Sequence, residues 1–306
     1  MNVSLLTIQL LNGFQLGMLL FLMAAGLTLV FGIMNFVNLA HGSLYMAGGY
    51  LAAVVFGKTA SFGWAVAAAT FGLLLLGAAL DRAAFVHLQA RRPLDQVLAT
   101  FGVILFSNSA VRYFWGGSPL YMDAPDWLSG AVDLMGYSYP VYRIAIIVVG
   151  ASVALGLHVL IDRTRIGMLI RAGASNRQMV QALGINIGWL NTFIFALGAA
   201  LAGLAGAVSG PVISIQPGMG EPVLILTLIV IVIGGIGSIR GALFGALIVG
   251  VVDTLGRGLM PVLLAQFGGS GLASSAAPAI ASVGVYVLMA AVLAFRPQGF
   301  FPVRKT

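Results

Sequence analysis

The chain of 306 residues contains no cysteine, which excludes a disulfide framework and any metal site that depends on a cysteine ligand. Charged residues are scarce as well, at 8% of the sequence, and Lys58 and Lys305 are its two lysines. The phosphate-binding pattern Gly-x-x-x-x-Gly-Lys-Ser/Thr is absent, so we expect no nucleotide-hydrolysing site and no cofactor on this polypeptide. No nucleophile with its base, acid–base pair or group of metal ligands stands out, so we expect no enzyme.

Apolar residues dominate the sequence. Hydrophobic residues make up 60% of the chain, and the mean hydropathy is +1.05. A water-soluble protein of this length could not bury so much apolar surface. The apolar runs are continuous rather than alternating, which favours helices over a transmembrane β-barrel. We therefore predict an all-α polytopic membrane protein whose single transmembrane domain spans residues 1–306.

Nine windows are long enough to cross about 30 Å of hydrocarbon. These windows are Leu5–Phe31, Val37–Phe56, Phe62–Leu80, Gln96–Trp115, Val141–Ile161, Trp189–Val208, Pro222–Ile239, Gly241–Gly256 and Ala279–Phe295. Val37–Phe56 and Gly241–Gly256 are rich in glycine and can be re-entrant instead of spanning. The sequence therefore predicts eight or nine transmembrane or re-entrant helices.

The basic residues are unevenly distributed. Eleven of the 15 Lys and Arg residues lie in Asp81–Asp95, Asp162–Gly188, Arg240 and Arg296–Thr306. The positive-inside rule places these stretches and the C-terminus in the cytoplasm, and it places Gly116–Pro140, which has no Lys or Arg, outside. Cations at membrane edges set orientation and meet anionic lipid head groups, so the net charge of +7 does not indicate a nucleic-acid partner.

A polar break separates the first two windows. The segment Asn35–Ser43 places two amides, an imidazole and a hydroxyl between helices, without the charges of an exposed loop. Polar groups at membrane depth are tolerated where they are buried in protein or line a cavity, and a broken helix frees backbone groups that can hold a zwitterion. The candidate residues of a translocation path are Asn35, Asn38, His41, Ser43 and Tyr45. The alternative is a tight turn capped by Asn and Ser at the membrane surface.

A second break, Gly234–Gly241, follows a run rich in β-branched residues. Its closely spaced glycines permit close helix approach or an unwound backbone, and both suit a moving pore wall. The candidate path residues here are Gly234, Gly235, Gly237 and Ser238. We expect the two breaks to approach each other near the membrane midplane and to line one path.

The two breaks are followed by similar sequences. His41–Ala47 and Arg240–Ala246 each show a polar residue, Gly, a small residue, Leu, an aromatic residue and, two positions later, Ala. The match indicates an internal repeat, and transporters commonly bind substrate where two repeats meet. Chance similarity between helices rich in Gly, Ala and Leu is the alternative.

The longest stretch on the predicted cytoplasmic side, residues 162–188, shows helical periodicity. Apolar residues recur at Met168, Ala172, Met179 and Leu183. Gly184 follows as a C-cap signal, so we predict a short amphipathic helix that faces the cytosol. This helix can lie in the lipid interface or dock onto a cytoplasmic partner, and the second interpretation suits a chain without an energy source of its own.

Ionisable residues inside the apolar windows are few. Arg112 and Arg143 lie near outer helix ends, where long side chains reach the interface, and we expect Glu221 at the outer interface. Asp253 remains as the single candidate for a functional charge within the membrane. A self-sufficient secondary transporter or a channel would need such a site, so this class is the alternative function.

Three sets of motifs resemble one family, in the right order along the chain. They are Asn35-Phe36 with Asn38-Leu39-Ala40-His41-Gly42, Arg171-Ala172 with Ala182-Leu183-Gly184-Ile185-Asn186, and Gly234-Gly235-Ile236-Gly237-Ser238 with Gly241-Ala242. Nearly the whole chain resembles the branched-chain amino acid permease subunit of the hydrophobic amino acid uptake family of bacterial ABC importers. Arg240, where a small or neutral residue is expected, and the loop after Gly116 depart from the family pattern.

The resemblance implies a multi-pass protein of the bacterial inner membrane that pairs with a homologous second permease. Its other implied partners are two cytoplasmic ATPase subunits, which use the ATP, and a periplasmic substrate-binding protein. The implied coupling helix lies in residues 162–188, with contacts from Arg171, Ala172, Arg177, Ala182, Leu183 and Gly184. The implied substrate is a branched-chain or other hydrophobic amino acid; urea, short amides and aromatic acids are alternatives, because their permeases share the scaffold.

Overall fold

The computed structural model describes residues 3–134 and 136–301, with side chains other than those of residues 3–5, 266–275 and 278. Its helices are α1 (Val3–Met34), α2 (His41–Thr59), α3 (Phe62–Leu80), α4 (Val86–Leu88), α5 (Pro93–Trp115), α6 (Val141–Arg163), α7 (Arg165–Ser175), α8 (Arg177–Ala182), α9 (Ile187–Ser209), α10 (Gly220–Gly234) and α11 (Ile239–Phe295). A π-helical turn, η1 (Asp81–Phe85), joins α3 to α4, and a 3₁₀ turn, η2 (Asp126–Leu128), precedes two short strands. Each predicted window therefore contains a helix.

Six described helical segments are long and apolar enough to cross a membrane. They are Leu6–Met34, Phe62–Leu88, Pro93–Trp115, Val141–Arg163, Ile187–Ser209 and Ile239–Ala265. Large apolar side chains such as Trp64, Phe71 and Phe106 are exposed on the outside of the bundle, as lipid contact requires. The chain is therefore a multi-pass membrane protein with six candidate spans among the described residues, and the count of eight or nine stays a prediction.

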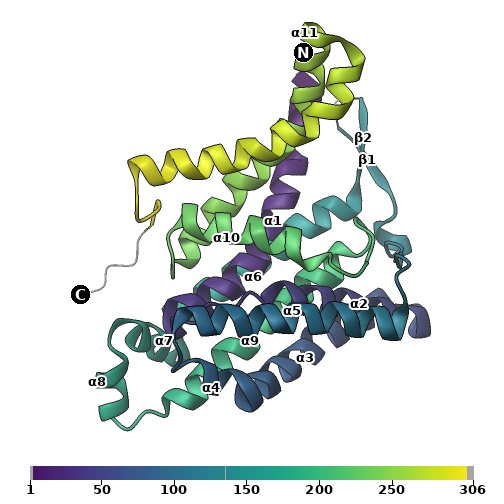
Figure 1. The fold of residues 1–306 in the computed structure, drawn as a ribbon. Helices are drawn as coiled ribbons and strands as arrows, with labels where there is room; N and C mark the ends of the chain where they lie inside the picture. Colours follow the sequence, from purple (N-terminus) through teal and green to yellow (C-terminus); the bar gives the residue numbers. More distant parts are fainter. Residues whose placement is uncertain (1–2, 135, 302–306) are drawn as a thin grey trace.

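The helices α1 and α9 form the centre of the bundle. In their spanning windows 72% and 78% of the residues are buried, against 17% to 22% in the other four. Small residues let the two helices approach: a Cβ atom on Gly26 of α1 would lie 2.7 Å from the carbonyl oxygen of Gly198 in α9. The helices α2 and α3 also pack against α9 (Figure 1).

The 57-residue helical run α11 folds back on itself. Gly256 and Ala281 would lie about 37 Å apart in a straight helix with a rise of 1.5 Å per residue. Instead, a Cβ atom on Gly256 would lie 3.3 Å from the Cβ atom of Ala281. Figure 1 shows the two legs meeting near the N-terminus, with the second leg in yellow. The run thus contains two helical legs, which correspond to the last two predicted windows.

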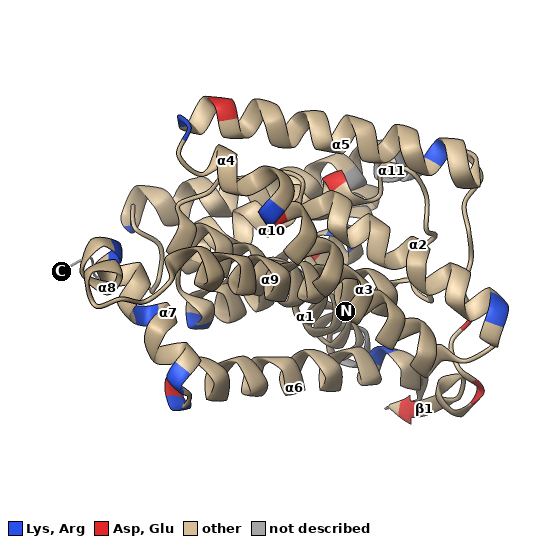
Figure 2. Ribbon diagram, turned by 90° about the horizontal axis from the view of Figure 1, so that it is seen from below, with Lys and Arg blue, Asp and Glu red and all other residues tan. Residues whose placement is uncertain are grey.

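The molecule has two chemically different ends (Figure 2). At the arginine-rich end lie α7, α8, α4 and the start of α5. Arg240 at the start of α11 belongs to the same end, because its Nη2 atom lies 3.0 Å from Asp162 Oδ2 at the end of α6. The opposite end, which we call the hairpin end, carries β1 and the ends of α2 and α5.

The hairpin end carries the two strands found among the described residues, and an isolated antiparallel bridge pairs Leu120 with Ile215. Strand β1 (Ala131–Leu134) pairs antiparallel with β2 (Tyr137–Pro140), with Ala131 opposite Pro140. Gly136 just before β2 has φ of +83°, a conformation that glycine adopts without strain. The all-α prediction is therefore wrong for the loop between α5 and α6, where a short hairpin satisfies backbone groups outside the apolar windows.

Candidate functional site

The first break is a strap that leaves the end of α1 and is held by α5. Asn35 turns the chain with φ of +48°, a left-handed conformation that asparagine tolerates better than most residues. The backbone N–H of Val37 then donates to Oε1 of Gln96 at 3.1 Å. Nε2 of Gln96 donates in turn to the carbonyl oxygens of Leu88 and Arg91, at 3.3 and 3.1 Å. Gln96 therefore ties the strap to the start of α5.

The strap brings the start of α2 into the interior. The imidazole of His41 lies beside Gly26 of α1, with Cε1 3.1 Å from the position of a Cβ atom. Gly26 precedes Met34 by eight residues, so α2 begins about 12 Å inward from the end of α1. Asn38 and His41 are each 1% exposed. Within the described part of the chain, both amide atoms of Asn38 and Nε2 of His41 have no hydrogen-bond partner.

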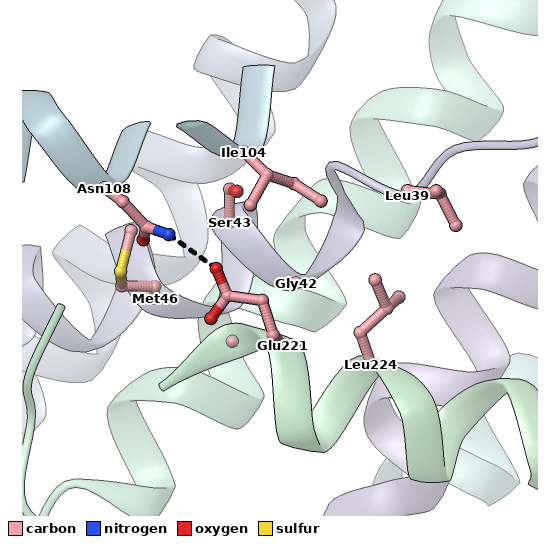
Figure 3. Close-up of a pocket in the computed structure, with 9 residues that line it drawn as sticks. Leu39, Gly42, Ser43, Met46, Ile104, Asn108, Glu221 and Leu224 are labelled. Atoms are coloured by element: carbon pink, nitrogen blue, oxygen red, sulfur yellow. Dashed lines mark hydrogen bonds between the residues drawn. The ribbon is translucent and has the colours of Figure 1, made fainter. Parts of the chain in front are cut away.

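On its other side, the start of α2 is closed by α5 and α10. A Cβ atom on Gly42 would lie 2.6 Å from the carbonyl oxygen of Gly220. Figure 3 shows Ser43 beside Asn108, whose Nδ2 atom donates to Oε1 of Glu221 at 2.5 Å. The gap lined by these residues has no room for a water molecule. Glu221, which the sequence places at the outer interface, lies in the first turn of α10, and its carboxylate reaches Asn108 of α5.

The second break joins α10 to α11 and also holds the end of the chain. Gly235 and Gly237 have φ of +104° and +85°, and the Oγ atom of Ser238 caps α11 by accepting the Gly241 N–H at 3.0 Å. The N–H of Phe301 donates to the carbonyl oxygen of Gly234 at 3.0 Å. Gly234 and Gly235 thus pack against the C-terminal segment rather than facing a cavity.

The two breaks meet at the arginine-rich end. A Cβ atom on Gly32 of α1 would lie 2.6 Å from the Cα atom of Gly237. Beside this contact lies a cavity of about 810 Å³, which we call the break cavity, lined by Asn35, Gly237 and Ser238. The other six predicted path residues do not line it. Its lining extends from charged residues at the arginine-rich end to Phe21, midway along α1.

Those charged residues form a cluster around Asp162. Its Oδ2 atom accepts from Arg240 at 3.0 Å and lies 2.8 Å from Nδ1 of His158. Nη1 of Arg171 lies 3.6 Å from the other carboxylate oxygen. The cluster ties α6, α7 and α11 together, and its residues line the break cavity. The arginine at position 240, which departs from the family pattern, therefore has a local partner.

The predicted single amphipathic helix is wrong. The segment forms two helices, α7 and α8, which break at Asn176 with φ of −146°. The side chain of Asn176 accepts the N–H of Met179 at 2.9 Å, and this local bond replaces helix continuation. The predicted C-cap is confirmed, since Gly184 has φ of +82° and the Ile185 N–H donates to the Val180 carbonyl oxygen.

The residues assigned to coupling differ in their surroundings. Arg171 reaches Asp162 and also donates to the carbonyl oxygen of Ile161, and Ala172 is half-buried against the core. Arg171 is exposed, and so are Arg177, Ala182, Leu183 and Gly184. Met168, Met179 and Leu183 are 55%, 58% and 72% exposed. These three apolar side chains therefore point outward, while Ile170 and Val180 of the same segment are buried in the core.

Two buried carboxylates lie in the candidate spans. Asp253 is not a lone charge, because Arg257, which the sequence analysis did not consider, places Nε 2.8 Å from its Oδ2 atom. The spacing of four residues on one helix could have revealed this pair. Asp81, assigned to a cytoplasmic stretch, is 1% exposed and accepts hydrogen bonds from Gln89 and Thr192. It joins η1 to α9.

Comparison with known proteins identifies the family of this chain. Residues 9–294 match the family described as "Branched-chain amino acid transport system / permease component". The chain belongs to this family. The resemblance inferred from the motifs is therefore confirmed over most of the chain.

Family relatives include the "High-affinity branched-chain amino acid transport system permease protein BraD" of Pseudomonas aeruginosa, 32% identical over 81% of this chain and 85% of the relative. The "High-affinity branched-chain amino acid transport system permease protein LivH" of Salmonella typhimurium is 30% identical over 81% of this chain and 84% of the relative. The "Ribose import permease protein RbsC" of Escherichia coli is 29% identical over 76% of this chain and 72% of the relative. No solved structure matches the chain significantly.

Proposed function

We propose that this protein is the membrane-spanning permease subunit of an ABC importer for branched-chain or other hydrophobic amino acids. The observation that carries the proposal is the family match over residues 9–294. The relatives named for branched-chain amino acid transport are more similar than the ribose import permease.

The proposed partners are a homologous second permease, two cytoplasmic ATPases that use the ATP, and a periplasmic binding protein. The exposed apolar residues of α7 and α8, together with Arg177 and Ala182, support a docking surface for an ATPase. The arginine-rich end then faces the cytoplasm of a bacterial inner-membrane protein, as the positive-inside rule requires. The C-terminal segment up to Phe301 then lies on the cytoplasmic side as well, because the Phe301 N–H donates to the Gly234 carbonyl oxygen at the arginine-rich end.

The break cavity is the proposed cytoplasmic section of the translocation path. Asn35 and Ser238 supply polar atoms, and Gly237 supplies a backbone without a side chain. Behind this cavity, Asn38 and His41 carry buried polar atoms without partners in the described chain, a feature that native proteins keep where function needs it. A self-sufficient secondary transporter is less favoured, because Asp253, its candidate coupling residue, is paired with Arg257.

Affinity purification of the tagged chain from native membranes tests this proposal. We expect a second permease and an ATPase to co-purify in stoichiometric amounts, and the purified complex to hydrolyse ATP. A chain that purifies alone under conditions that preserve other ABC importers, and that transports an amino acid with a proton or sodium gradient, would contradict the proposal.

A further inference from the structure

A second cavity lies toward the hairpin end and is separate from the break cavity. It has a volume of about 390 Å³ and is enclosed by the first half of α1, the start of α6, α10 and the first leg of α11. This volume falls in the range of about 300–1,000 Å³ that small-molecule sites occupy. Of the residues assigned to the path from the sequence, Tyr45 alone lines it. We call it the hairpin-end cavity.

One wall presents an arginine that has no acidic partner. Arg143 lines the cavity and donates through Nη1 to Oδ1 of Asn12 at 2.5 Å. Among the described residues Arg143 forms no ion pair. A guanidinium has five N–H donors, and its fork fits a carboxylate with two parallel hydrogen bonds. This wall is therefore suited to a carboxylate.

Helix α11 contributes an incompletely satisfied carboxylate to the lining. Asp253 is 3% exposed, and its Oδ2 atom is paired with Nε of Arg257. Its Oδ1 atom has no hydrogen-bond partner within the described residues. A buried acceptor left without a donor destabilises the protein, and more so when the acceptor is charged. An ammonium group in the cavity would supply the missing donor.

The same cavity also has an aliphatic part. Leu16 and Leu20 of α1 and Val223 and Leu226 of α10 line it. A positive and a negative anchor beside an apolar wall match a zwitterion with an aliphatic side chain. A sugar would leave the apolar wall unused, and a simple anion would leave Asp253 Oδ1 unpaired.

Both cavities lie along α1. Leu20 lines the hairpin-end cavity, and the next residue, Phe21, lines the break cavity. Residues of α6 and α11 also line both. Midway along α1 this helix packs closely on α6, because a Cβ atom on Gly150 of α6 would lie 2.6 Å from the Cβ atom of Met18.

We infer that the hairpin-end cavity is a binding site for the transported amino acid, with Arg143 on its carboxylate and Asp253 on its ammonium group. The inference rests on the proposed function and adds the site and its chemistry. Substrate entering from the hairpin end is held there until the contact between Met18 and Gly150 opens toward the break cavity.

Single cysteines in this cysteine-free chain test the site in the assembled transporter. Thr254 lines the cavity, and Ser129 is exposed at the hairpin end outside it. We expect a membrane-impermeant maleimide to label both Thr254→Cys and Ser129→Cys. Leucine at ten times its dissociation constant slows labelling of an occupied site about tenfold by mass action, and we expect this protection at Thr254→Cys alone.

A ligand series separates the two anchors. Isoamylamine lacks the carboxylate and 4-methylpentanoate lacks the ammonium group, so we expect neither to protect Thr254→Cys at concentrations where leucine does. Adding Arg143→Gln should abolish protection by leucine, and Arg143→Lys serves as a second variant if the glutamine protein fails to assemble.

Absence of labelling at Thr254→Cys, equal protection by all three ligands, or no protection by leucine while the transporter still takes leucine up would overturn the site. A complex that takes up no amino acid at all would instead contradict the proposed function, so the two failures are distinguishable.

Discussion

At the residue scale, the polar groups buried beside the first break distinguish it from an ordinary turn. Thr28, Asn38 and His41 each carry a side-chain atom with no partner in the described residues, although each is at most 1% exposed. A structural turn would satisfy such groups, since each orphaned atom destabilises the fold by about 1–3 kcal/mol. Their presence favours a role in transport over a role in stability.

Replacing Asn38 by leucine tests this interpretation. We expect the unfolding temperature of Asn38→Leu to stay equal or rise, because two unsatisfied atoms are removed, while uptake falls by about tenfold or more with the loss of one hydrogen bond to substrate or water. Thr227→Val is the matched control, since this buried hydroxyl bonds within its own helix to Val223. Wild-type uptake in Asn38→Leu would show the break to be a structural turn.

Gln96 has the opposite role, because its three hydrogen bonds hold the strap in place. Gln96→Leu leaves the Val37 N–H without its acceptor, so we expect a loss of about 1–3 kcal/mol in the free energy of unfolding. Gln178→Leu, on an exposed position of α8, is the control. Comparison of the unfolding midpoints in detergent provides the measurement. Equal midpoints would mean that other contacts position the strap.

At the element scale, the sequence predicts helices well where the apolar window is long. The window Phe62–Leu80 coincides with α3, and Trp189–Val208 lies within α9. Prediction fails in the segment 162–188, because periodicity identifies a core face only when water covers the other face. Here Met179 and Leu183 are apolar yet exposed, and Val180 is the buried residue of α8.

The candidate site is predicted only in part, for a related reason. Asn35 and Ser238 stand out as polar residues between apolar windows, and the structure brings both to one cavity. The hairpin-end cavity draws Asn12, Arg143 and Asp253 from three helices far apart in the chain. No local pattern joins these residues, so a sequence without structure gives no reason to group them.

The exposed surface of α8 leads to a prediction about coupling. Ala182→Glu places a charged side chain on this surface, and overpacking of a docked face typically costs about 1–3 kcal/mol, enough to weaken association about tenfold. We expect less ATPase to co-purify with this variant, while the membrane domain keeps its unfolding temperature. Ala131→Glu makes the same change at the hairpin end and should retain the ATPase. Undiminished ATPase in Ala182→Glu would favour a helix in the lipid interface.

At the scale of the whole molecule, the same three helices, α1, α6 and α11, line both cavities. The hairpin-end cavity lies toward one end of these helices, and the break cavity extends to the other. Midway along α1 and α6, Met18 lies close to Gly150. If substrate passes between these helices from one cavity to the other, they must separate at that contact, and their packing then acts as the gate.

A reversible cross-link tests the gate. Met18→Cys combined with Gly150→Cys brings two thiols within reach of a disulfide, since the Cβ positions lie 2.6 Å apart before relaxation. We expect oxidation to stop uptake and reduction to restore it, because a bond across the contact prevents α1 and α6 from separating. Each single variant should be insensitive to the oxidant. Full uptake by the oxidised, cross-linked protein would place the path elsewhere.

The central claim is that this chain forms a path which another subunit powers. The most direct measurement is uptake of radiolabelled leucine into proteoliposomes that contain either the complex purified with this chain or the chain alone. The account predicts ATP-dependent uptake against a gradient by the complex with its binding protein, and none by the chain alone under a proton or sodium gradient. Uphill uptake by the chain alone would contradict it.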